Sequence, residues 1–307
     1  MDWDTRPNLR YEKGIIGNNR WTFINTRVQS SIHGAISIVN AIATGYGSAL
    51  GISLQVKVEL ELQEGQGILF QPRPGTNLLK NVINNLLPKQ IARNNLVKVD
   101  VKSQIPAGVG LKSSSAVSSA LALACSGLVG NELDDNVILK SAIRASLDAG
   151  VTITGAYDDS TACYFGGFVV TNNYGFNLMH REEAPADLFV VIFLPANKRR
   201  GKICNLYAFS DLFMEAFDLA NARHYWKAMK LNGLLTTSAL CGDYEPILAS
   251  IQRGALAASI SGNGPSIAVI TYKEHVDDIR QIFDPYDGVT LVSKVNNEKA
   301  SVKVIVG

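Results

Sequence analysis

Residues 106–116 read Pro106-Ala-Gly-Val-Gly-Leu-Lys-Ser-Ser-Ser-Ala116, and this stretch decides the fold. It follows an alternating apolar run, Leu96 to Val101, which predicts a strand, and it leads into Ser115 to Val129, which predicts a helix. A loop of small residues at a helix N-terminus is a natural anion site, because the first N–H groups have no partner inside the helix. The serine hydroxyls can add hydrogen bonds to phosphate oxygens. The alternative is an ordinary glycine turn with a serine N-cap.

The loop matches neither of two common phosphate-binding patterns. A P-loop needs Gly before its lysine, whereas Leu111 precedes Lys112, and the dinucleotide fingerprint needs a third glycine after Gly108 and Gly110. The stretch instead resembles the P-x-x-x-G-L-x-S-S-x-A signature of the GHMP kinases, a family of small-molecule kinases. The resemblance implies that the loop binds ATP through Pro106, Ala107, Gly108, Val109, Gly110, Leu111, Lys112, Ser113, Ser114, Ser115 and Ala116.

Composition excludes several classes of protein. The 307 residues are 47% hydrophobic and 18% charged, which fits one large or two closely packed globular domains. A net charge of +2 gives no long-range attraction to nucleic acid. No apolar run is long enough to cross a membrane, and the first 25 residues lack the apolar core of a signal peptide. We therefore expect a cytoplasmic protein with neither a nucleic-acid nor a membrane partner, and the sequence leaves its oligomeric state open.

The four cysteines give no sign of a metal site or a disulfide framework. They lie far apart and without C-x-x-C spacing, at Cys125, Cys163, Cys204 and Cys241. We expect buried free thiols in a reducing compartment. The four histidines are also dispersed, without the spacing of metal ligands.

The hydrophobic periodicity predicts an α+β chain, because strands and helices mix without strict alternation. The predicted helices are residues 77–87, 115–129, 134–149, 205–235, 246–253 and 274–283. The predicted strands are 48–62, 96–101, 168–171, 188–194, 255–260, 266–272, 289–293 and 301–306, after an opening strand and turn in 32–45.

A second informative stretch is Gly150-Val-Thr-Ile-Thr-Gly-Ala-Tyr-Asp-Asp-Ser-Thr-Ala-Cys-Tyr-Phe-Gly-Gly167. It places Asp158 and Asp159 in a run otherwise nearly free of charge, where a partly buried carboxylate is costly unless it is paired or binds a metal. Phosphoryl transfer to an alcohol needs a group that accepts the hydroxyl proton. The alternative is that one aspartate caps a short helix beginning near Ser160.

The GHMP resemblance assigns roles to these acidic residues. Asp159 holds the position that faces the substrate hydroxyl, so it is the expected catalytic base and a substrate-binding residue. Ser114 and Asp148 hold the positions of the ligands to Mg²⁺, which accompanies ATP. Lys112 stands where the family often has Gly, and its ammonium would reach a phosphate or point to solvent. The role of Asp158 stays open.

A third stretch, Ser259-Ile-Ser-Gly-Asn-Gly-Pro-Ser266, is a Gly-rich turn between two predicted strands. It resembles the family motif that borders the substrate pocket, which implies substrate contacts by Gly262, Asn263 and Gly264. The first family motif is weak, because His33-Gly34-Ala35 stands where a Pro-Gly pair is common.

The resemblance covers residues 28–307 and implies the GHMP kinase fold, two packed α+β subdomains with the ATP and substrate cleft between them. We expect an N-terminal ATP-binding subdomain at 28–166 and a C-terminal subdomain at 167–307. Residues 1–27 are expected to be an extension, which is either a genuine N-terminal arm or a segment upstream of a translation start at Val28.

The lysine in the phosphate loop and the string Gly155-Ala-Tyr-Asp-Asp159 resemble the archaeal-type shikimate kinase branch of the family. The implied reaction converts ATP and shikimate into ADP and shikimate 3-phosphate, on the route to chorismate and the aromatic amino acids. Alternatives are another GHMP kinase, such as a homoserine kinase, and an inactive GHMP-like ligand sensor. The carboxylate of shikimate needs a cationic partner. The candidates are Arg144, Lys198, Arg199, Arg200 and Lys202.

Overall fold

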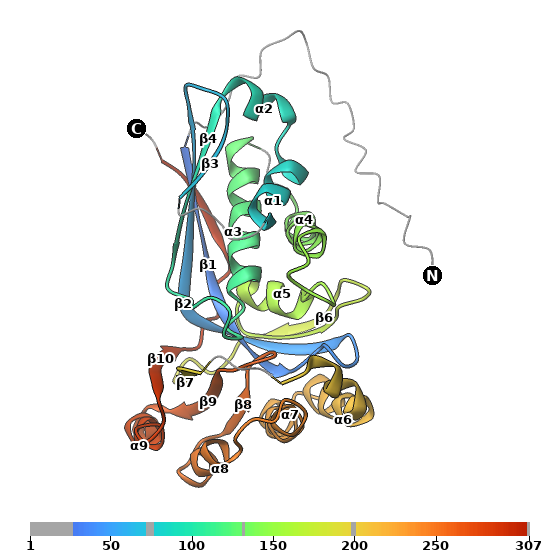
Figure 1. Cartoon of the computed structure of the whole chain (residues 1–307), viewed down its shortest axis with the longest axis vertical. Helices are drawn as coiled ribbons and strands as arrows, with labels where there is room; N and C mark the ends of the chain where they lie inside the picture. The colour runs from blue at the N-terminus through green and yellow to red at the C-terminus, as the bar shows by residue number, and fades with distance from the viewer. Residues whose placement is uncertain (1–26, 72–76, 131–132, 198–200, 306–307) are drawn as a thin grey trace.

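The computed structural model describes residues 27–71, 77–130, 133–197 and 201–305. Over these residues the chain forms two sheets, each with helices packed against one face (Figure 1). The predicted α+β class is confirmed. The expected extension lies outside the described residues except for Arg27, and so do Lys198, Arg199 and Arg200.

Two long central strands organise the larger sheet. In the described chain its strands are β1 (Arg27–Val39), β2 (Tyr46–Gln63), β3 (Gly67–Gln71), β4 (Leu96–Ser103), β5 (Phe168–Asn172), β6 (Asn177–Glu182) and β11 (Ser301–Val304). β1 pairs antiparallel with β2 and β11, and β2 also pairs with β4 and β5. β3 runs parallel to β4, and β6 forms a hairpin with β5. One continuous sheet therefore joins both ends of the described chain.

Helices from the first half of the chain cover one face of this sheet (Figure 1). They are α1 (Leu78–Leu86), α2 (Lys89–Asn94), α3 (Ser113–Leu128), α4 (Asp135–Asp148) and α5 (Tyr157–Phe165). α3 packs against β1 and β2, and its residues Ala116, Ala120 and Ala124 are fully buried. Small side chains let this helix lie close to the sheet, with its N-terminus at the end nearest the second sheet.

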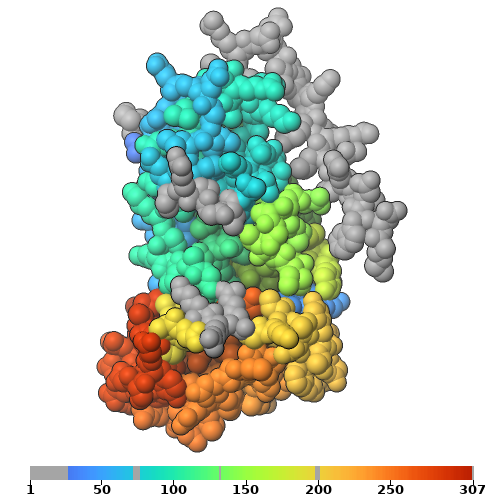
Figure 2. Space-filling model, in the orientation of Figure 1, coloured from blue at the N-terminus to red at the C-terminus, as the bar shows by residue number. Residues whose placement is uncertain are grey.

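The second half of the chain forms a smaller antiparallel sheet in the order β10-β7-β9-β8. Its strands are β7 (Leu188–Pro195), β8 (Ala257–Ile260), β9 (Ile267–Tyr272) and β10 (Gly288–Lys294). The helical segments on it are η1 (Ile203–Phe209), α6 (Ser210–Asn221), α7 (Tyr225–Ala239), α8 (Glu245–Gln252), η2 (Lys273–His275) and α9 (Val276–Ile282). The two halves lie one above the other in the space-filling view (Figure 2), and α7 contacts both β8 and β1.

The structure adds short elements to the predicted ones. β3, α2 and β6 were not predicted from the periodicity, and α5 was considered only as an alternative that begins near Ser160. The other elements fall close to their predicted ranges. The division of the chain between residues 166 and 167 stays a prediction. β5 and β6, which follow that boundary, pair into the larger sheet, and the smaller sheet begins with β7.

All four cysteines are free, but the prediction that they are buried is wrong for two of them. Cys125 and Cys163 are buried in helices α3 and α5, whereas Cys204 in η1 and Cys241 just after α7 are exposed. No helix in the described part of the chain combines the length and the apolar character needed to cross a membrane.

Candidate active site

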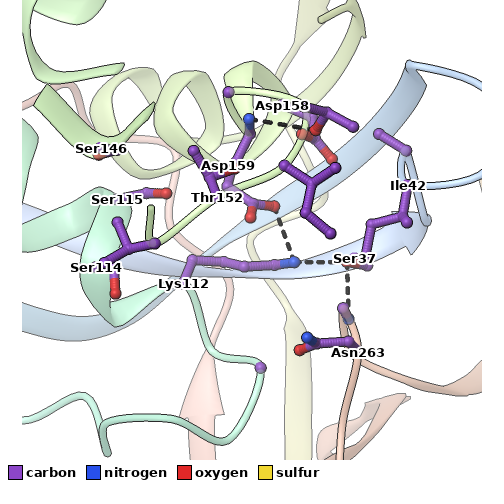
Figure 3. A pocket seen from close by; sticks show the side chains of 18 of the residues that line it. Ser37, Ile42, Lys112, Ser114, Ser115, Ser146, Thr152, Asp158, Asp159 and Asn263 are labelled. Carbon is purple, nitrogen blue, oxygen red and sulfur yellow. Dashed lines mark hydrogen bonds and ion pairs between the residues drawn. The ribbon is translucent and has the colours of Figure 1, made fainter. Parts of the chain in front are cut away.

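A cavity of about 400 Å³ lies where the two halves meet (Figure 3). Its walls come from the end of β1, the loop before α3, the loop between α4 and α5, and the turn between β8 and β9. The predicted site residues that line it are Gly108, Gly110, Lys112, Ser113, Ser114, Ser115, Asp159, Gly262 and Asn263. The predicted residues outside the lining are Pro106, Ala107, Val109, Leu111, Ala116, Asp148 and Gly264.

The loop before α3 ends in a left-handed turn that exposes the start of the helix. Gly108, Gly110 and Lys112 all have positive φ, and Lys112 is the N-cap residue. Its side chain does not cap the helix, and the first N–H with a helical carbonyl partner is that of Ala116. The serine N-cap considered for this loop is therefore absent, because the left-handed Lys112 occupies that position. The N–H groups of the first turn remain available to an anion.

The two aspartates lie inside α5. The helix begins at Tyr157, after Ala156 in the left-handed conformation, so the alternative of an aspartate capping a helix that begins near Ser160 does not hold. Neither aspartate is the N-cap residue, and both stand in the first turn. Both aspartates line the cavity, but their partners differ: Asp158 is 3% exposed and bonds to Asn173, whereas Asp159 pairs with Lys112.

Lys112 lies at the centre of the polar contacts in the cavity. Its Nζ is 2.8 Å from Oδ1 of Asp159 and donates a 2.7 Å hydrogen bond to Oγ of Ser37, as the dashed lines in Figure 3 mark. The lysine side chain is 6% exposed, so it does not point to solvent. Burial by itself would lower the pKa of Lys112, but the negative charges of Asp159 and Asp158 outweigh it and the pKa is raised. The cavity therefore holds a permanently charged ammonium beside Asp159.

Asp158 is held by a reciprocal pair of hydrogen bonds. Nδ2 of Asn173 donates to its Oδ1 at 2.8 Å, and its backbone N–H donates to Oδ1 of Asn173 at 3.1 Å. Burial raises the pKa of Asp158 to about 7, and the charge of Asp159 adds to the rise, while Lys112 and Asn173 oppose it. These two hydrogen bonds hold the first turn of α5 against Asn173, which directly follows β5.

Ser37 joins the loop before α3 to the turn after β8. Its Oγ accepts from Lys112 and from the backbone N–H of Gly262 at 3.0 Å. Oγ of Ser261 accepts from the N–H of Ser37 at 3.2 Å and donates to the carbonyl of Gly110 at 2.8 Å. A side chain at Gly110 would collide with the carbonyl of Ser261, so only glycine permits this approach.

The predicted Mg²⁺ ligands, Ser114 and Asp148, are not part of the ion pair between Lys112 and Asp159. Ser114 is exposed at the start of α3 and lines the cavity. Asp148 stands in the last turn of α4, and its Oδ1 is 3.1 Å from Nε of Arg144. Within the described residues, no group of three or more His, Cys, Asp or Glu side chains could hold a metal ion by itself.

The structure places two of the predicted partners for a substrate carboxylate outside the cavity lining. Arg144 is paired with Asp148 on the surface of α4, and Lys202 is exposed. Lys202 immediately precedes Ile203, which does line the cavity. The other three candidates lie outside the described residues.

Sequence reasoning missed several residues of the site, namely Ser37, Asn40, Thr152, Thr154 and Asn173. Ser37 and Asn40 are polar positions in an otherwise apolar strand end, and that pattern was the available signal. Asn173 gave no signal, because its partner Asp158 is 15 residues away in a different element.

Comparisons with known proteins agree with this geometry. A family model described as GHMP kinases N terminal domain matches residues 77–167. The chain is 34% identical over 276 residues to the shikimate kinase of Methanobrevibacter smithii, covering 86% of this chain and 95% of that protein. It is also 34% identical over 279 residues to the shikimate kinase of Methanothrix thermoacetophila, covering 89% and 96%.

Solved structures share the fold at low identity. The homoserine kinase from Cytophaga hutchinsonii superposes with a TM-score of 0.72 at 19% identity, covering 93% of this chain and all of that chain. The L. major mevalonate kinase in complex with R-mevalonate gives a TM-score of 0.71 at 16% identity, covering 90% and 99%.

Proposed function

The chain belongs to the GHMP kinase family, in the branch of the archaeal shikimate kinases, and we propose that it transfers the γ-phosphoryl group of ATP to the 3-hydroxyl of shikimate. The observation that carries the proposal is the Asp159 carboxylate, 2.8 Å from a buried ammonium and in the same cavity as the open N-terminus of α3. The proposed proton acceptor, Asp159, and the proposed phosphate site at the start of α3 thus line the same cavity.

The start of α3 binds the phosphates of ATP in this proposal. The backbone N–H groups of the first turn and the hydroxyls of Ser113, Ser114 and Ser115 supply donors. Two of the three N–H donors of the Lys112 ammonium are directed at Asp159 and Ser37, and we assign the third to the phosphoryl group. The adjacent positive charge favours the negative charge of the transferring group.

Asp159 accepts the proton of the attacking hydroxyl. A bond forms between the acceptor oxygen and the γ-phosphorus, the bond from that phosphorus to the β-phosphate oxygen breaks, and ADP leaves. The proton passes to the Asp159 carboxylate, which Lys112 orients. Most of the rate enhancement then comes from positioning and charge balance.

In this proposal Ser114, which lines the cavity, and Asp148, which lies outside the lining, would hold Mg²⁺. A hydroxyl and a carboxylate are hard oxygen donors, and Mg²⁺ usually takes few protein ligands and completes its shell with phosphate oxygens and water. Oδ1 of Asp148 is engaged by Arg144, which leaves Oδ2 for a cation. When bound, the ion would neutralise charge on the β- and γ-phosphates.

The test is an ADP-release assay with Mg-ATP and, in parallel, shikimate, homoserine and mevalonate. We expect turnover with shikimate alone. Turnover with another alcohol would keep the fold and the mechanism but reject the substrate, and ATP binding without any turnover would favour the sensor alternative.

The Asp159→Asn variant tests the base. We expect its turnover to fall by a factor on the order of 10² or more with little change in ATP affinity, because the amide keeps the shape of the side chain but cannot accept the proton. Turnover close to that of the wild-type enzyme would remove Asp159 from this role.

A further inference from the structure

The hydroxyl of Ser37 has one hydrogen left to donate. Its Oγ accepts from Nζ of Lys112 at 2.7 Å and from the N–H of Gly262 at 3.0 Å. An ammonium and a backbone N–H have no acceptor capacity, so neither can receive the Ser37 hydrogen. A serine oxygen has two lone pairs, and both are occupied. The O–H is thus an oriented donor without an acceptor among the described residues.

The remaining direction of this O–H is the cavity. Ser37 is 1% exposed and lines the cavity at the end of β1. The rest of its surroundings is occupied by its own strand, by Lys112 and by the turn that carries Gly262. A buried donor without a partner is costly, which favours a ligand oxygen at this point.

Ser37 lies on the acceptor side of the ion pair. In Figure 3 the Lys112 side chain runs from the start of α3, where Ser114 and Ser115 lie, past Asp159 to Ser37, with Ile42 beyond. The oxygens of Asp159 and Ser37 are both within 2.8 Å of one nitrogen, so they are at most about 5.5 Å apart. Two hydroxyls on neighbouring carbons of one molecule fit this spacing, one at each oxygen.

We propose that Ser37 determines specificity by donating a hydrogen bond to a second hydroxyl of the acceptor, on the carbon next to the hydroxyl that Asp159 deprotonates. The substrate class is then a vicinal diol, and in shikimate the second group is the 4-hydroxyl. The inference rests on the proposed function and adds a reason for the choice of alcohol. A site built around a substrate hydroxyl discriminates strongly against a molecule that lacks it.

The experiment compares shikimate with its analogue lacking the 4-hydroxyl, in the wild-type enzyme and in Ser37→Ala. We expect the wild-type kcat/KM to be at least about tenfold lower for the analogue. In Ser37→Ala this ratio should shrink to less than about threefold, because the donor is gone for both substrates. Ser31→Ala is the matched control, since Ser31 lies on the same strand and its buried Oγ has no partner in the described chain. It should keep the wild-type ratio.

Two results would overturn the assignment. One is a wild-type enzyme that uses shikimate and the analogue equally well, a measurement that needs no variant. The other is a wild-type ratio retained in Ser37→Ala, or in Ser37→Cys where the alanine variant fails to fold, even if activity falls for both substrates. That second pattern would mean that Ser37 only supports Lys112 and Gly262. Absence of wild-type turnover with shikimate would instead refute the proposed function.

Discussion

Lys112 balances the charge of the cavity. Without it, Asp158 and Asp159 would be adjacent carboxylates of α5 without this compensating positive charge, one fully buried and the other largely so. The lysine comes from a position where the sequence pattern of the family often has glycine, and its backbone is left-handed while its side chain reaches Asp159 and Ser37. One residue thus shapes the loop and neutralises the carboxylate.

We expect Lys112→Met to reduce turnover at least 100-fold and the free energy of unfolding by on the order of 2–4 kcal/mol, because the variant leaves Asp159 unpaired in a mostly buried place. Steady-state kinetics and urea unfolding would measure both. Lys102→Met is the control, since the Lys102 side chain is 79% exposed and its ion pair is on the surface. An active Lys112→Met enzyme of normal stability would contradict the argument.

Asp158 makes stability depend on pH. Its pKa is raised from 3.8 to about 7, so the folded chain keeps a proton that the unfolded chain releases above about pH 4. The stabilisation is complete below about pH 4 and is lost as the pH rises through about 7. Asp158→Asn cannot ionise and should gain stability relative to the wild-type protein over this interval, by on the order of 1–4 kcal/mol.

Urea unfolding of the two proteins between about pH 4 and about pH 8 tests this, with the difference between them as the readout. Asp187→Asn, an exposed position, is the control. A difference that does not change with pH would show that Asp158 keeps the same charge throughout.

At this scale the sequence singled out residues of the cavity but not the contacts between them. The phosphate loop, Asp159 and Lys112 were all singled out, but the ion pair between the last two was not. Ser37 was missed because its partners, Lys112 and Gly262, are 75 and 225 residues away. Local patterns carry no information on such pairings.

Hydrogen bonds from a neighbouring strand end fix the position of α5, the helix that carries Asp159. α5 has nine residues and begins at a left-handed Ala156, so its own hydrogen bonds do little to fix its first turn. That turn is anchored by Asn173, which is fully buried and also accepts from Thr171 at 2.8 Å. Because Asp159 follows Asp158 in the same turn, the contacts of Asn173 with Asp158 also fix the position of Asp159.

Asn173→Ala should lower kcat while leaving the KM for ATP unchanged, since α5 moves but the start of α3 does not. We also expect a loss of stability on the order of 2–3 kcal/mol, because Asp158 and Thr171 lose their partner in the interior. Asn172→Ala, which removes one exposed hydrogen bond to Gly175, is the control. Equal kinetic effects of the two variants would refute the anchoring role.

The unpredicted elements share a physical cause. β3 has five residues and depends on parallel pairing with β4, α2 has six residues after Pro88, and β6 is exposed at every second position. Segments this short are stabilised by their neighbours rather than by their own periodicity. The long helices α3 and α4 have enough turns to show a pattern in the sequence.

At the scale of the whole molecule, the site exists only when both halves are docked. Asn232 of α7 is fully buried, accepts from the N–H of Asn40 at 2.9 Å and donates to Ser259 at 2.8 Å. Phe168 of the larger sheet stacks on Tyr225 of α7. The apolar core is likewise shared, since one buried cluster includes residues of both sheets. These contacts make the two halves one cooperative unit.

A bound ligand should therefore stabilise the entire chain and not one half of it. The Asp159→Asn variant is expected to consume ATP and shikimate more slowly by a factor on the order of 10² or more, so it allows a measurement with both ligands present. At about 100 times the dissociation constant, each ligand should add about 2.7 kcal/mol to the free energy of unfolding. In scanning calorimetry we expect a single transition that moves to higher temperature with either ligand and further with both. Because the cavity takes lining residues from β1, α3, α5 and the turn after β8, a transition that splits on ligand addition, with one part unmoved, would show that the halves unfold separately and that the cavity walls are not coupled.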